Sequence, residues 1–176
     1  KSAAYKPRPY TLITHKPVEY GSTLHLGTNC LMPRVEIHSP ETYIFQIALD
    51  VRISDINYGG HLGNDSLLSI AHEARIRFLA SFGYKELDIC GLGIIMADSA
   101  IIYKSEAFLG ETLHVDIALD DIRRSSFDII YRVSAKNDGR DVALIKTGIL
   151  FFDYNLKKVQ SIPDAFRRKI ASPESE

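Results

Sequence analysis

Apolar residues occupy every second position over residues 43–53, with polar or small residues between most of them. This alternation predicts a β-strand with one face turned to a core. The same period returns at 113–119 and 127–133, and the segments 93–104 and 142–152 are almost continuously apolar. The hydrophobic pattern therefore predicts five strands, of which two are apolar on both faces.

One long helix is predicted between the first two strands. Residues 54–63 contain three glycines together with Asp55 and Asn57, which is typical of a turn. Asn64 or Asp65 can cap a helix start, and Gly83 can end it. Apolar residues then recur at helical spacing and form one stripe, at Leu67, Ala71, Ala74, Phe78 and Phe82. A second, short helix is predicted over residues 163–170.

The order strand, long helix, four strands is typical of an α+β layer architecture, with the sheet curled around the helix. Short connections at Gly110, at residues 124–126 and at residues 137–139 predict antiparallel neighbours. One helix cannot cover strands that are apolar on both faces. We therefore expect a second copy of the chain to cover the rest, in a homo-oligomer.

The first forty residues differ from the remainder, because five prolines interrupt them and no hydrophobic period persists. We predict an extended or partly ordered N-terminal arm over residues 1–40 and a single domain over residues 41–176. Residues 1–20 hold three prolines and no continuous apolar block, which does not match a signal peptide.

Composition excludes several classes of protein. The 176 residues are 45% apolar and 24% charged with a net charge of −1, which excludes low-complexity disorder for most of the chain and disfavours a nucleic-acid partner. No apolar run is long enough to span a membrane. Two cysteines and six scattered histidines indicate neither a disulfide framework nor a metal site. We expect reduced thiols in a cytoplasmic protein, and no cofactor.

The turn before the helix runs Asp55-Ile-Asn57-Tyr-Gly-Gly60-His61-Leu-Gly-Asn64, and Glu73-Ala-Arg75 follows on the helix. This pattern resembles the hot-dog-fold acyl-CoA thioesterases of the 4-hydroxybenzoyl-CoA thioesterase-like branch, which carry Asp-x-Asp-x-x-Gly-His-x-Asn-Asn and Glu-Ala-Arg there. The resemblance covers residues 43–165. It implies a long central helix wrapped by a five-stranded antiparallel sheet, in dimers, tetramers or larger rings, with active sites at the dimer interface near the helix start.

The chain departs from that pattern at one position, because the usual catalytic aspartate is replaced by Asn57. An amide is neither a nucleophile nor a general base at neutral pH. If the protein hydrolyses thioesters, another group must activate water, or Asn57 holds the water in place. The candidate bases are Asp55, Glu73 and Asp98. The competing structural roles are a turn at Asp55, a surface ion pair of Glu73 with Arg77, and pairing of Asp98 with Arg75 or another nearby base.

The other parts of a thioesterase site also have candidates. The N–H groups of Gly60 and His61, with the positive end of the helix dipole, could hold the oxyanion, and His61 could orient the substrate. Substrate contacts are further assigned to Tyr58 and Asn64. Coenzyme A phosphates could bind Arg123 and Arg124, or Lys104, although adjacent arginines at a turn are often only solvated. An acyl slot could be lined by Tyr58, Leu62, Leu68 and Ile95.

The predicted function is hydrolysis of an acyl-CoA or related thioester, with coenzyme A as part of the substrate. One alternative is a hot-dog hydratase or dehydratase, whose Asp-x-Asn-Pro-x-His motif resembles Asp55-x-Asn57. No proline follows Asn57 here, and the spacing from Asp55 to His61 is one residue too long. A second alternative is a non-catalytic protein that binds acyl thioesters, which the loss of the aspartate favours.

Overall fold

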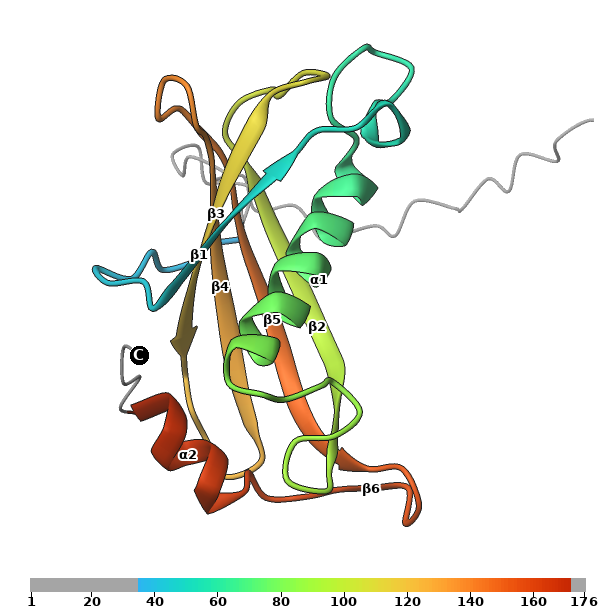
Figure 1. Cartoon of the computed structure of the whole chain (residues 1–176), viewed down its shortest axis with the longest axis vertical. Coiled ribbons are helices and arrows are strands. Elements are labelled where there is room, and N and C mark those ends of the chain that lie inside the picture. Colours follow the sequence, from blue (N-terminus) through green and yellow to red (C-terminus); the bar gives the residue numbers. More distant parts are fainter. Residues whose placement is uncertain (1–34, 172–176) are drawn as a thin grey trace, which may run out of the picture. The chain divides into compact units, whose positions relative to one another are not determined.

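The computed structural model describes residues 35–171 (Figure 1). Of the predicted arm, residues 1–34 lie outside the described residues, and residues 35–40 form neither helix nor strand. The predicted elements are all present. In chain order they are β1 (Phe45–Asp50), the 3-10 turn η1 (Ile53–Asp55), α1 (Asn64–Ser81), β2 (Gly93–Tyr103), β3 (Thr112–Asp120), β4 (Ser126–Ala135), β5 (Asp141–Asp153), β6 (Lys158–Val159) and α2 (Asp164–Ala171).

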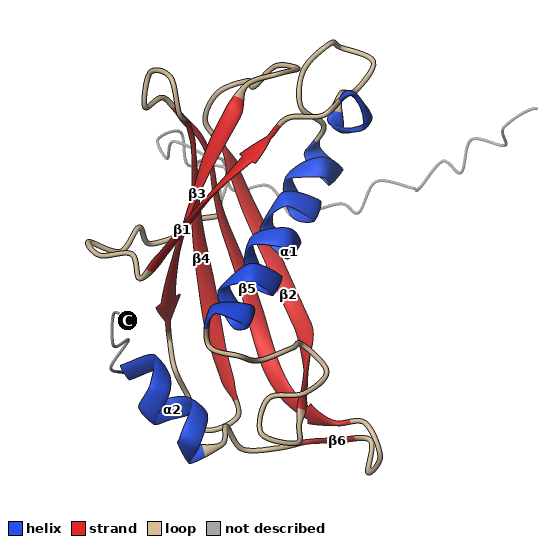
Figure 2. Ribbon diagram, viewed as in Figure 1, coloured by secondary structure: helices blue, strands red, loops and turns tan. Residues whose placement is uncertain are grey.

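The five long strands form one antiparallel sheet in the order β1-β3-β4-β5-β2. The sheet curves around α1, which lies along one of its faces (Figure 2). The two strands that flank α1 in the sequence are thus the two edges of the sheet. The expected helix wrapped by five antiparallel strands is confirmed. A two-residue strand that the sequence pattern did not predict, β6, pairs with the end of β5.

Helix α1 is held to the sheet by its apolar stripe. Ala74 and Phe78 are completely buried, and Leu67 and Ala71 nearly so. The helix ends where Gly83 adopts a φ of +77°, a left-handed conformation that glycine adopts without steric cost. The predicted stripe and the predicted end at Gly83 are therefore confirmed, whereas the predicted cap at Asn64 or Asp65 is wrong, because Gly63 is the N-cap and Asn64 is the first helical residue.

The first strand is shorter than predicted, since β1 ends at Asp50. The chain turns at η1, where the Asp55 carboxylate accepts a hydrogen bond from the Arg52 N–H at 2.8 Å. Alternation alone continues to Ile53, but this local side-chain to backbone bond competes with further pairing.

The short helix α2 closes the end of the sheet that lies farthest from the start of α1 (Figure 1). Phe166 is fully buried there and its ring lies 5.3 Å from that of Phe151 and 5.7 Å from those of Phe127 and Tyr84. Such aromatic pairs add stabilisation beyond the burial of area alone. The terminal helix is thus part of the core.

The loop between α1 and β2 is tied to the helix by ion pairs. Glu86 accepts a hydrogen bond from Arg75 Nε at 2.6 Å, and its second oxygen lies 3.0 Å from His72 Nε2. Burial alone would raise the pKa of the Glu86 carboxyl, but His72 and Arg75 lower it below its ordinary value.

We expect the free energy of unfolding to decrease as the pH falls below about 4.5, the ordinary pKa of this carboxyl. Glu86 has a lower pKa in the folded chain than in the unfolded chain, so its contribution is complete above that pH and is lost as Glu86 becomes protonated. Urea denaturation across this range is the measurement. The Glu86→Gln variant should have a shallower pH dependence, and an unchanged slope would contradict the prediction.

Candidate functional site

Asn57 builds the turn that precedes α1. Its side-chain oxygen accepts a hydrogen bond from the Gly59 N–H at 2.8 Å, and its carbonyl oxygen accepts one from the Gly60 N–H at 3.1 Å. Gly60 has a φ of +81°, which a residue with a side chain adopts only with strain. The amide of Asn57 therefore has a structural role here, and the Gly60 N–H is already engaged within the turn.

The ring of His61 packs against this turn. A Cβ atom on Gly59 would lie 3.0 Å from His61 Nε2, so the glycine leaves room for the ring. His61 Nδ1 lies 3.3 Å from the Leu62 carbonyl oxygen and 3.4 Å from the side-chain nitrogen of Asn57. These contacts fix the orientation of the imidazole, with Nε2 beside Gly59 and 3.9 Å from Glu106 Oε1.

The start of α1 lies beside this histidine. Gly63 is the N-cap and makes no side-chain cap bond, and its own N–H donates to the Asp55 carbonyl oxygen at 2.8 Å. The amides of the first helical turn carry a partial positive charge and can bind an anionic oxygen. A hollow of about 420 Å³ lies over this turn, lined by Asn57, Tyr58, Gly59, His61, Gly63, Asn64 and Asp65.

A second hollow, of about 280 Å³, shares His61 and Asn64 with the first. One part of its wall is apolar, at Leu62, Leu67, Ala107 and Val142, and the other part is polar, at Lys104, Ser105 and Glu106. The Leu62 N–H donates to the Ala107 carbonyl oxygen at 2.8 Å, which joins the turn to the segment after β2. His61 therefore stands between a polar and a mainly apolar hollow.

Arg140 holds the Glu106 segment in place. Its guanidinium donates to Ser105 Oγ at 3.1 Å, to the Glu106 carbonyl oxygen, and to Glu111 at 2.9 Å. Ser105 Oγ in turn donates to the Asp141 carbonyl oxygen at 2.6 Å. These bonds come from β5 and its neighbouring turn, so the sheet itself positions the carboxylate near His61.

We expect Arg140→Met to weaken the site more than the fold. Three hydrogen bonds that hold residues 105–111 are lost, whereas the side chain is partly solvated and each such bond stabilises by only about 1 kcal/mol. The melting temperature and the rate of the reaction proposed below should be measured together. Lys136→Met, on the same β4–β5 turn, is the control, and a reaction rate in Arg140→Met equal to that of the control would contradict the prediction.

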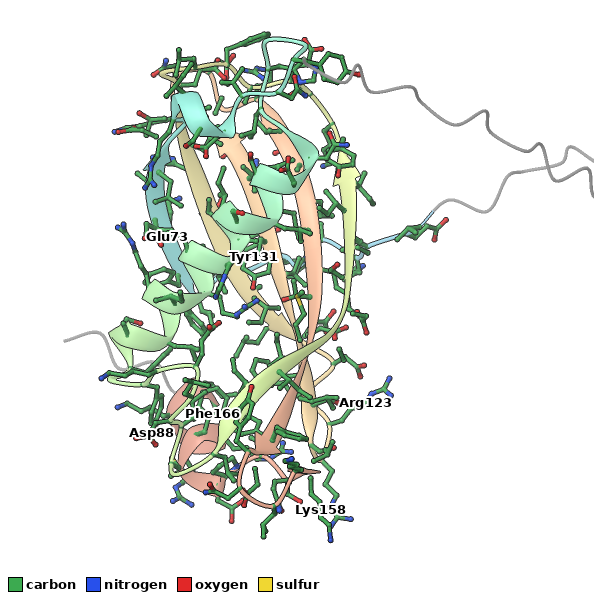
Figure 3. The ribbon with its side chains drawn as sticks, turned by 90° about the vertical axis from the view of Figure 1, so that its right-hand side faces the viewer. Glu73, Asp88, Arg123, Tyr131, Lys158 and Phe166 are labelled. Carbon is green, nitrogen blue, oxygen red and sulfur yellow. The ribbon has the colours of Figure 1, made fainter. Side chains whose placement is uncertain are left out.

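The structure places the three candidate bases apart from His61. The Asp55 carboxylate binds the Arg52 N–H, as described above, and so serves the turn. Glu73 forms an exposed ion pair with Arg77 at 2.8 Å. Glu73 also lies on the side of α1 away from β2 (Figure 3). Its predicted surface ion pair is confirmed.

Asp98 lies on the face of the sheet opposite α1. A β-bulge at Ala97 shifts the register, so that Met96 faces the helix and Asp98 pairs with Gly148 on the outer face. Its carboxylate is 60% exposed and binds Lys146 Nζ at 2.8 Å. The predicted pairing of Asp98 with a nearby base is thus confirmed with Lys146 as the base, and its pairing with Arg75 is wrong, because Arg75 pairs with Glu86.

The remaining predicted residues fall in two places. Tyr58, at the rim of the first hollow, is completely exposed with a relative accessibility of 108%. Asn64 lines both hollows. Arg123 and Arg124 lie in the β3–β4 connection, at the opposite end of the sheet from His61 (Figure 3). There Arg123 binds Asp121 at 2.7 Å and Arg124 Nε donates to Ser161 at 3.2 Å. Within one chain the two arginines cannot contact a ligand at His61.

Sequence reasoning missed Glu106, the carboxylate that the fold brings nearest to His61 Nε2. The one signal in the sequence was its position two residues after the strand predicted over residues 93–104. The carboxyl end of β2 lies at the same end of the sheet as the start of α1. Among the described residues, no group of three histidine, cysteine, aspartate or glutamate side chains is arranged to hold a metal ion. No helix between residues 35 and 171 is both long and apolar enough to span a membrane.

Comparison with known families decides which family this architecture represents. The model of the Thioesterase-like superfamily matches residues 51–170, which include the turn, both hollows and the whole of α1. The chain belongs to the Thioesterase-like superfamily. No curated protein sequence matches it significantly.

Solved structures of thioesterases share its fold. A 1,4-dihydroxy-2-naphthoyl-CoA thioesterase from Synechocystis superposes with a TM-score of 0.68 at 18% identity, over 75% of this chain and 98% of the other. A thioesterase-superfamily protein from Jannaschia gives 0.68 at 17% identity, over 76% and 84%. A gentisyl-coenzyme A thioesterase gives 0.63 at 17% identity, over 70% and 99%. The hot-dog fold expected for this member of the Thioesterase-like superfamily is thereby confirmed.

Proposed function

We propose that the protein hydrolyses acyl thioesters of coenzyme A to a free acid and a thiol. The observation that carries this proposal is the position of His61, which lies between the start of α1 and Glu106 and lines both hollows. Membership of the Thioesterase-like superfamily supports the same reaction class. Two fold relatives are thioesterases of aromatic coenzyme A esters, which makes acyl-CoA the first substrate to test.

In the proposed mechanism the thioester carbonyl lies over the first turn of α1. Backbone N–H groups there stabilise the negative charge that develops on the carbonyl oxygen when water attacks. If the Nδ1 proton of His61 is donated to the Leu62 carbonyl, Nε2 carries the lone pair and accepts the proton of the attacking water. Glu106 then stabilises the imidazolium. The C–S bond breaks, and the thiolate leaves with that proton.

The two hollows divide the substrate between them in this proposal. The apolar wall at Leu62, Leu67 and Val142 accepts the start of the acyl group. The open hollow over the turn admits the polar coenzyme A arm, with Tyr58 at its rim. Lys104 lines the second hollow and pairs with Asp141 at 3.0 Å. Arg123 and Arg124 could meet the phosphates only if a second chain supplied them.

Release of thiol from acyl-CoA by the purified protein tests the proposal. Saturated, aromatic and enoyl esters should be compared, because a hydratase would consume the enoyl ester without releasing thiol. We expect turnover of at least one saturated or aromatic ester. Binding of the esters without thiol release would contradict the proposal and favour the non-catalytic alternative, in which Asn57 marks the loss of the usual carboxylate.

We further propose that the protein is a homodimer joined through β2. This strand is eleven residues long, lies at the sheet edge, and exposes Met96 and Tyr103. An edge strand of this length presents free backbone N–H and C=O groups that a second copy can pair. Light scattering after gel filtration should give a multiple of 19.8 kDa. A single-chain mass at micromolar concentration would contradict it.

A further inference from the structure

A third hollow, separate from the two at His61, lies farther along α1. It has a volume of about 210 Å³ and is bordered by α1, β2 and β5. Its lining comprises Leu68, Ser69, His72, Arg75, Met96 and Thr147. This hollow shares no lining residue with the two at His61.

The floor of this hollow is polar although it lies within the helix–sheet layer. Thr147 is only 1% exposed and Arg75 only 8%. The Tyr131 hydroxyl, completely buried below the helix (Figure 3), lies 3.2 Å from Thr147 Oγ1. Buried polar groups are costly unless they are hydrogen-bonded, and these groups are, because Thr147 pairs with Tyr131 and Arg75 pairs with Glu86.

The charge of Arg75 is balanced, but its hydrogen-bonding capacity is not used up. Nε donates to Glu86 at 2.6 Å, and the Tyr131 hydroxyl is a second hydrogen-bond partner of the Arg75 side chain. Burial alone would lower the pKa of Arg75, but Tyr131 and Glu86 raise it, so the side chain remains charged. A guanidinium has five N–H donors. The hollow is therefore rich in donors and close to neutral overall.

The hollow lies on the same side of α1 as the site at His61. Asn64, Leu68, His72 and Arg75 are spaced by four, four and three residues, which puts them on one face of the helix. From Asn64 to His72 the helix rises by roughly 12 Å. The long Arg75 side chain leans back toward the helix start, as helical side chains do. A medium-length acyl group attached at the helix start can thus reach the hollow.

We propose that this hollow binds the far end of the acyl group and selects acyl groups that carry a neutral oxygen there, as a hydroxyl or carbonyl. This inference rests on the proposed function for the position of the thioester. Arg75 and Thr147 donate hydrogen bonds to the oxygen, while Leu68 and Met96 enclose the adjoining carbons. A terminal carboxylate gains less, because Glu86 already neutralises Arg75.

Binding of two coenzyme A thioethers tests the proposal without turnover. S-octyl-coenzyme A and its ω-hydroxy counterpart differ only in the terminal oxygen, and neither can be hydrolysed. By isothermal titration calorimetry we expect the wild-type protein to bind the hydroxylated thioether about tenfold more tightly, the effect of roughly one buried hydrogen bond. Equal affinities, or no binding of either thioether, would overturn the proposal.

Two variants separate selection from a merely structural role. Arg75→Met and Thr147→Val should bring the ratio of the two dissociation constants close to one, because each removes a donor to the terminal oxygen. Arg77→Met, exposed on the same helix, is the matched control and should retain the wild-type ratio. If Arg75 only ties Glu86 to the helix, its loss lowers the melting temperature but not the ratio, which contradicts the proposal.

The outcome is distinguishable from failure of the proposed function. A preference for the hydroxylated thioether in a protein that releases no thiol from acyl-CoA supports this assignment of the hollow and contradicts the hydrolase. Thiol release without a preference for the hydroxylated thioether supports the hydrolase and contradicts this assignment of the hollow.

Discussion

Replacement of His61 by alanine is expected to lower kcat for thiol release about a thousandfold, within the range that removal of a general base produces. The imidazole is the side chain that lines both hollows and also faces a carboxylate. Its loss removes the proton acceptor but leaves the amides at the start of α1. KM should therefore change much less than kcat. Steady-state thiol release with a saturating acyl-CoA provides the measurement.

The matched control is His38→Ala, which removes an exposed histidine that lines none of the three hollows. It should retain most of kcat. In Glu106→Gln, kcat should decrease about ten- to a hundredfold. The substitution keeps the shape of the side chain but removes the charge that stabilises the imidazolium. Wild-type kcat in His61→Ala would contradict the mechanism and direct attention to another proton acceptor.

The second large effect is expected on stability, at Phe166. Truncation to alanine should decrease the free energy of unfolding by about 3–5 kcal/mol, because it empties a fully buried ring position. Three aromatic neighbours, Tyr84, Phe127 and Phe151, lose a partner at once. The packing of α2 on the sheet should weaken with them. Urea denaturation followed by circular dichroism measures the change.

Arg168→Ala is the control on the same short helix, because Arg168 is exposed and its loss should change stability by less than about 0.5 kcal/mol. The folded fraction of Phe166→Ala should keep its rate of thiol release, since α2 lies at the end of the sheet away from His61. A loss below about 1 kcal/mol would show that α2 does not belong to the core.

Most of the fold could be predicted from the hydrophobic pattern. The period of two predicted β1, β3 and β4, and two continuously apolar segments predicted β2 and β5. The apolar stripe and Gly83 predicted the buried face and the end of α1. The predicted end of β1 was too late, because the alternation of apolar residues continues past Asp50 and does not reflect the hydrogen bond between Asp55 and Arg52 that turns the chain. The bulge at Ala97 could not be predicted either. Because β2 carries apolar residues on both faces, its hydrophobic pattern does not specify the register.

The site was predictable only in part. The turn chemistry around Asn57, Gly60 and His61 is local in sequence, and it indicated the end of α1 at which the two hollows lie. Glu106 was not predicted as a site residue, because it lies 45 residues after His61 in the sequence. Its approach to His61 depends on the pairing of β2 with β5 and on the hydrogen bonds of Arg140. Contacts between segments that are distant in the sequence do not produce a periodic hydrophobic pattern from which they could be predicted.

The strand order also bears on how the chain acquires its structure during synthesis. Among residues 35–171, β2 pairs with β5 alone, so about forty further residues must leave the ribosome before this pairing can begin. Long-range pairing of this kind slows folding and leaves an apolar strand exposed in the meantime. A nascent chain arrested before Asp153 is therefore expected to need a chaperone, and one released after α2 is not.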